Sequence, residues 1–106
     1  MEEKKEMTPS ERMNALALRA QAQLLRMSAD AFDHIADHGE DEETNWFLVA
    51  VNRVMQRIEK RKKSFLPVEK ELPEAYRKME NLRGMYLRDW LTEQVERCIQ
   101  ELKEDL

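Results

Sequence analysis

The charged side chains between residues 12 and 37 fall on one narrow strip of a predicted helix. At about 100° per residue they lie within roughly 80° of one another on the helix surface. These residues are Arg12, Arg19, Arg26, Asp30, Asp33 and Asp37. The rest of the helix surface is therefore uncharged, which restricts the chain to folds that cover this helix on more than one side.

Two apolar rows follow the uncharged surface, and each alternates steps of three and four residues, the spacing of a coiled-coil seam. The first row is Met13, Ala17, Ala20, Leu24, Met27 and Ala31. The second row is Ala15, Leu18, Ala22, Leu25, Ala29, Phe32 and Ala36. The rows lie roughly 150° apart. On one side they are separated only by Asn14, Gln21 and Ser28, which are easy to bury when hydrogen-bonded.

A helix in a small monomer normally buries one apolar row, and an exposed second row is uncommon on monomeric proteins. We therefore predict that the protein forms a homo-oligomer, or binds another protein, through helix faces. The alternative is that both rows are buried inside the core of this chain.

The composition favours an all-α fold: good helix formers dominate and there are only two Gly and three Pro. We expect an antiparallel bundle of three long helices, at about 9–38, 42–63 and 73–104, within a single helical domain of residues 8–106. Residues 1–7 form a charged N-terminal tail. Thr8 is placed to cap the first helix and Gly39 to end it. Asp41 and Pro73 suit the starts of the other two, and Gly84 interrupts the third pattern.

The start of the second helix, residues 46–51, is apolar all round, which predicts enclosure on several sides. Aromatic residues at helical spacing are usually core, but Trp also anchors protein interfaces. The candidate interface residues are Leu18, Leu25, Phe32, Trp46, Phe47 and Val51.

A basic cluster ends the second helix and suggests an alternative function. It consists of Arg53, Arg57, Lys60, Arg61, Lys62 and Lys63. Its simplest role is to complement the negative end of the helix dipole. Arg57 and Arg61 are four residues apart, however, so both could reach one phosphate group of a nucleotide or nucleic acid. The net charge of −4 and the lack of a helix-turn-helix or finger pattern make nucleic acid the less favoured ligand.

His34 and His38 are spaced so that both imidazoles share one helix face, within reach of one metal ion. They also continue the first apolar row, so they could simply end a hydrophobic face near carboxylates. A metal site at this pair is the third candidate function.

No catalytic constellation stands out, so we expect a non-enzymatic protein without a cofactor. Cys98 lies among apolar residues at helical spacing, which predicts a buried structural cysteine. A lone cysteine fits a reducing compartment, and the apolar runs are too short to cross a membrane, so a cytoplasmic location without membrane association is expected. The preferred hypothesis is an oligomeric adaptor, regulator or inhibitor that acts by protein–protein interaction.

Overall fold

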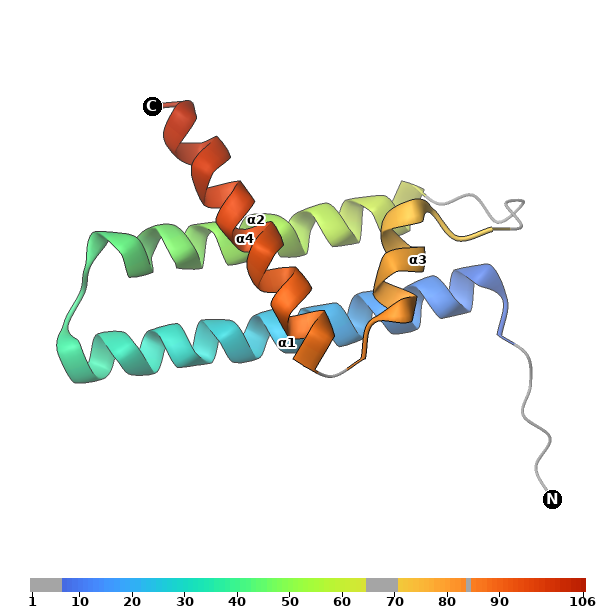
Figure 1. Ribbon diagram of the computed structural model, residues 1–106, viewed down its shortest axis with the longest axis horizontal. Helices are drawn as coiled ribbons and strands as arrows, with labels where there is room; N and C mark the ends of the chain where they lie inside the picture. Colours follow the sequence, from blue (N-terminus) through green and yellow to red (C-terminus); the bar gives the residue numbers. More distant parts are fainter. Residues whose placement is uncertain (1–6, 65–70, 84) are drawn as a thin grey trace, which may run out of the picture.

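All regular secondary structure in the described part of the chain is helical, as the computed structural model in Figure 1 shows. The structure describes residues 7–64, 71–83 and 85–106. Within these ranges the helices are α1 (Pro9–His38), α2 (Glu42–Ser64), α3 (Glu74–Asn81) and α4 (Met85–Glu104). The predicted all-α fold is confirmed. The predicted bundle of three long helices is wrong, because the segment 73–104 forms two helices.

The ends of α1 lie where the sequence predicts them. Thr8 caps the N-terminus, because its hydroxyl oxygen accepts a hydrogen bond from the backbone N–H of Glu11 at 3.2 Å. Gly39 ends the helix with a φ of 86°, and its N–H donates to the carbonyl oxygen of Ile35 at 2.8 Å. Residues with a side chain rarely adopt this backbone conformation, so a glycine is required here.

Asp41 starts α2 by accepting two hydrogen bonds from Thr44, at 2.7 Å from the backbone N–H and at 2.8 Å from the hydroxyl. The backbone hydrogen bond is the main reason why the pKa of Asp41 lies below its usual value. Only residues 39–41 separate α1 from α2, so the two helices form an antiparallel hairpin (Figure 1).

The break between α3 and α4 corrects the predicted continuous third helix. Leu82 is extended, with φ −100° and ψ 138°, and its N–H donates to the carbonyl oxygen of Met79 at 3.1 Å, which closes the last turn of α3. Its side chain packs against the core. After this break α4 crosses both helices of the hairpin at a steep angle (Figure 1). The predicted interruption at Gly84 lies outside the described residues, as do residues 1–6 of the tail and the connection at 65–70.

One hydrophobic core joins the four helices and Leu72, which lies just before α3. Ion pairs bridge the same elements at the surface: Arg57 on α2 to Glu101 on α4 at 2.8 Å, and Asp30 on α1 to Arg88 on α4 at 2.8 Å. Because these pairs are exposed, each contributes about 0–1 kcal/mol and mainly fixes orientation. The free energy of folding comes chiefly from the buried side chains, which are Met13, Leu16, Ala17, Ala20, Leu24, Met27, Ala50, Val51, Val54, Ile58, Leu72, Tyr76, Met79, Leu87, Leu91, Val95 and Cys98.

Candidate interaction surface

The two apolar rows of α1 have opposite environments. Every residue of the first row is buried against α2, α3 and α4. In the second row the large side chains are exposed: Leu18 by 54%, Leu25 by 57% and Phe32 by 60%. The chain's own core therefore accounts for one row and leaves the other open. We call the second row the α1 seam, consisting of Ala15, Leu18, Ala22, Leu25, Ala29, Phe32 and Ala36.

The α1 seam alternates small and large side chains. Its large residues recur every seven positions and an alanine stands between each pair. Alanines let a second helix approach closely, while the large side chains fill the gaps that they leave. The pattern suits packing against another helix rather than binding of a small ligand.

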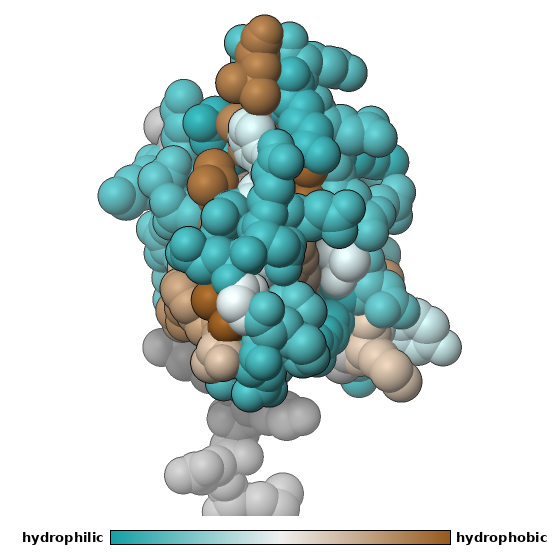
Figure 2. All heavy atoms as spheres, turned by 90° about the vertical axis from the view of Figure 1, so that its left-hand side faces the viewer, coloured by the Kyte–Doolittle hydropathy of each residue, from teal (hydrophilic) through white to brown (hydrophobic). Residues whose placement is uncertain are grey.

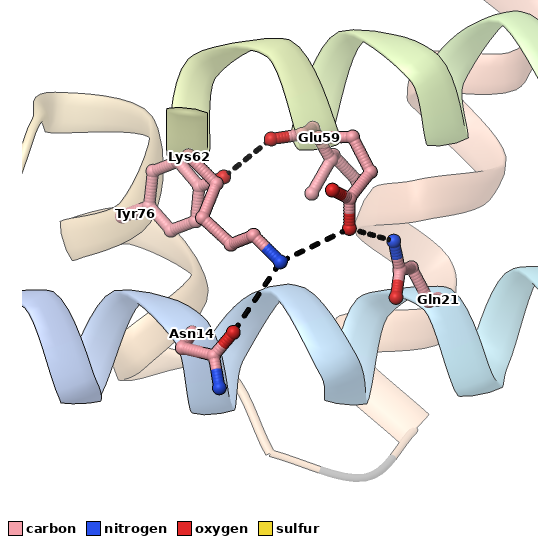
Figure 3. Close-up of polar contacts among 6 residues, drawn as sticks. Asn14, Gln21, Glu59, Lys62 and Tyr76 are labelled. Atoms are coloured by element: carbon pink, nitrogen blue, oxygen red, sulfur yellow. Dashed lines mark hydrogen bonds and ion pairs between the residues drawn. The ribbon is translucent and has the colours of Figure 1, made fainter. Parts of the chain in front are cut away.

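Polar side chains border the seam on the side that faces α2 (Figure 3). Gln21 donates a hydrogen bond to the carboxylate of Glu59. Lys62 bridges to the same carboxylate at 3.2 Å and to Asn14 at 3.3 Å. The bonds from Lys62 and Gln21 lower the pKa of Glu59. Two of the three uncharged residues between the rows, Asn14 and Gln21, are thus hydrogen-bonded to α2, as their position in the sequence suggested.

The charged strip borders the seam on its other side, and its two halves differ in sign. Arg19 and Arg26 are exposed in the N-terminal half, and Asp33 and Asp37 are exposed in the C-terminal half. Within the described part of the chain, the side chains of these four residues make no hydrogen bond or ion pair. Their charged groups can therefore pair with opposite charges on a partner.

The remaining interface candidates lie on α2, where one is buried and two are half-buried. Val51 is 1% exposed and lies in the core, so the prediction that it contacts a partner is corrected. Trp46 and Phe47 are half-buried and line an open groove of about 640 Å³ between the hairpin and α4, together with Ile99. Figure 2 looks onto the hairpin end that carries the α1–α2 turn, where the surface is mainly hydrophilic with separate apolar patches.

The histidine pair is exposed at the same end. The rings of His34 and His38 stack with centroids 4.7 Å apart. His34 Nε2 lies 3.3 Å from a carboxylate oxygen of Asp41, and His38 Nδ1 lies 3.3 Å from the carbonyl oxygen of His34. Within the described ranges, no group of three or more potential metal ligands converges. The predicted metal site therefore rests on the two imidazoles alone.

The six basic residues at the end of α2 do not share one surface. Arg57 and Arg61 line a recess against α4, as their four-residue spacing predicts. Lys62 turns toward α1, while Lys60 and Lys63 line a shallow depression beside Gln21. Arg53 is exposed one turn before Arg57.

Two features of that recess were missed by the sequence reasoning. Arg97 from α4 joins Arg57 and Arg61 there, although it is 36 residues from Arg61 in the sequence. Tyr76 from α3 forms part of the floor, and its hydroxyl donates to the carbonyl oxygen of Ile58 at 2.7 Å (Figure 3). Burial raises the pKa of Tyr76 to about 12. Only the crossing of α4 over α2 brings these groups together, and no local pattern encodes it.

Comparison with protein-family models, curated proteins and solved structures found no match to this chain.

Cys98 is buried and unpaired, as predicted. No helix in the described ranges is both long enough and apolar enough to span a lipid bilayer.

Proposed function

We propose that the protein is a non-enzymatic helical protein that acts by protein–protein interaction, and that the surface it uses is the α1 seam. The observation that carries this proposal is the exposure of Leu18, Leu25 and Phe32 at seven-residue intervals on a helix whose other apolar row is buried. Because each of these three side chains is a little over half exposed, a partner that buried it fully would gain about 1 to 1.5 kcal/mol, roughly half of the value for a fully exposed side chain.

A second copy of this chain is the partner that fits the seam. In an antiparallel pair of α1 helices, one register sets Ala22 against Phe32 of the second copy and Ala29 against Leu25 of the second copy. Each pair of facing seam residues then combines one small and one large side chain, so the side chains fill the interface without overlap. The two-fold axis repeats each contact, as a symmetric dimer requires.

The charged strip favours the antiparallel orientation. The same register brings Arg19 beside Asp33 of the second copy, and the two-fold axis repeats this pair. A parallel pair would instead place the basic halves of both strips together and the acidic halves together, and like charges at this distance repel. The apolar seam therefore supplies the free energy of association, and the charged strip favours the antiparallel over the parallel orientation.

Self-association of this kind supports a role as an oligomeric adaptor, regulator or inhibitor. The hairpin helices supply a rigid centre. Surfaces away from the seam, including the groove at Trp46 and Phe47, stay available for a further partner. The protein then acts by presenting two copies of these surfaces in a fixed relation.

The test is native mass spectrometry of the intact chain across protein concentrations from about 1 to about 100 µM, a range that detects Kd values typical of modest dimers. We expect a species of twice the 12.7 kDa chain mass whose fraction rises with concentration. A mass of 12.7 kDa at every concentration would overturn the proposal.

A further inference from the structure

The recess between α2 and α4 is built from side chains of three helices. One face of α4 presents Trp90, Gln94, Arg97 and Glu101, which recur at steps of four, three and four residues. Opposite them stand the arginines of α2, Arg57 and Arg61, and the floor is formed by Val54, Ile58, Ala75, Tyr76 and Met79. We call this the arginine recess.

Arginines outnumber carboxylates in the arginine recess. Among the described residues its lining includes Arg57, Arg61 and Arg97 and one acidic residue, Glu101. Arg57 contacts Glu101 through Nη2 at 2.8 Å, and Arg97 contacts Glu93 through Nη2 at 2.9 Å. A guanidinium has five N–H donors, so each of these two ion pairs leaves donors for a ligand.

Guanidinium groups that converge from two helices suit a phosphate group. Their planar N–H donors match phosphate oxygens in pairs, and charge-assisted hydrogen bonds of this kind are stronger than neutral ones. The apolar floor also excludes water beneath the arginines, which strengthens their attraction for an anion.

The volume of the recess limits the ligand to a small one. It is about 250 Å³, below the range of roughly 300–1,000 Å³ that is usual for pockets that enclose drug-sized ligands. The half-buried indole of Trp90 and the amide of Gln94 stand on the same α4 face and offer a contact for a group attached to the phosphate.

From this geometry we infer that the arginine recess binds a phosphate dianion, either inorganic phosphate or the phosphate group of a small monoester. Arg57 and Arg97 hold the phosphate oxygens from opposite walls. Glu101 competes with the ligand for Arg57. This site uses different helix faces from the α1 seam and does not depend on self-association.

The test is isothermal titration calorimetry of the full chain at low salt with inorganic phosphate and, separately, with a nucleoside monophosphate. Binding of both identifies the phosphate as sufficient, whereas binding of the monophosphate alone shows that the attached group contributes; either result supports the site. Absence of heat with both ligands would overturn it.

Three variants locate the binding. Arg97→Gln should weaken binding by about tenfold or more, the scale of one charge-assisted hydrogen bond. Arg53→Gln is the matched control: it removes the same charge from α2 outside the recess and should change the Kd by less than about twofold. Equal losses in both variants would indicate diffuse charge attraction and overturn the site.

Glu101→Gln separates a binding role from a structural one. Because it releases Arg57 from its ion pair, it should tighten phosphate binding several-fold even if it slightly lowers thermal stability. Weaker binding in this variant, with the helical circular dichroism spectrum unchanged, would contradict the assignment.

Discussion

The two apolar rows of α1 have the same helical spacing and similar composition, yet one is the centre of the core and the other is in water. Leu24 is fully buried, while the next residue in the chain, Leu25, is 57% exposed. Row spacing alone cannot distinguish them, because each row by itself is a complete coiled-coil seam. Spacing therefore shows that this helix has two apolar rows, and burial shows that the fold of one chain covers only the first.

The largest expected effect comes from truncating the two adjacent leucines. Leu24→Ala should lower the free energy of unfolding by about 2–5 kcal/mol, because it leaves a cavity in the core. Leu25→Ala should change it by less than about 0.5 kcal/mol, because its side chain is already in water. Urea denaturation at a concentration where the chain is monomeric measures both.

Equal losses in the two variants would mean that the second row is also packed inside the chain. That result would restore the alternative in which both rows belong to one core.

A smaller effect is expected from the charges beside the seam. Arg19→Glu should weaken self-association by about tenfold, since it replaces two symmetric ion pairs by two repulsions of a few tenths to 1 kcal/mol each. Combining it with Asp33→Arg should restore the affinity to within about threefold of the original. Sedimentation equilibrium at low and high salt measures the dimer Kd.

Arg26→Gln is the control for this charge exchange. In the proposed register Arg26 lies close to the two-fold axis and therefore near Arg26 of the second copy. Because these like charges repel, removing them should not weaken the dimer. If the double charge exchange is no tighter than Arg19→Glu alone, the antiparallel orientation is wrong.

Much of the hairpin could be predicted from the sequence because its signals are local. Thr8 and Gly39 are positioned at the ends of one apolar pattern, and hydrogen bonds inside a single turn suffice to fix those ends. The start of α2 is also fixed locally, by the hydrogen bond from the backbone N–H of Thr44 to the side chain of Asp41. The polar residues Asn14 and Gln21 were also recognisable as residues that need hydrogen-bond partners.

The crossing of α4 could not be predicted, because it depends on packing between distant segments. Gly84 signals an interruption near Leu82, but neither the extended backbone of Leu82 nor the direction that α4 takes follows from it. Leu82 packs against the core that also contains Tyr76, and that packing depends on residues far away in the sequence. The same crossing brings Arg97 to Arg57. The sequence therefore predicts that Arg57 and Arg61 share one face of α2, because they are four residues apart. That Arg97 joins them can be known only from the tertiary structure.

If the α1 seam, rather than exposed apolar surface in general, joins two copies of this chain, only substitutions within the seam should separate the copies. Val49 allows a matched comparison, because it is 50% exposed and lies outside the seam. The most direct measurement is analytical ultracentrifugation of the double variant Leu25→Gln/Phe32→Gln beside Val49→Gln and the unchanged chain. We expect a 12.7 kDa species for the seam variant at concentrations where the other two sediment at twice that mass. A seam variant that still sediments at twice 12.7 kDa, or a Val49 variant that does not, would show that the α1 seam is not the dimer interface.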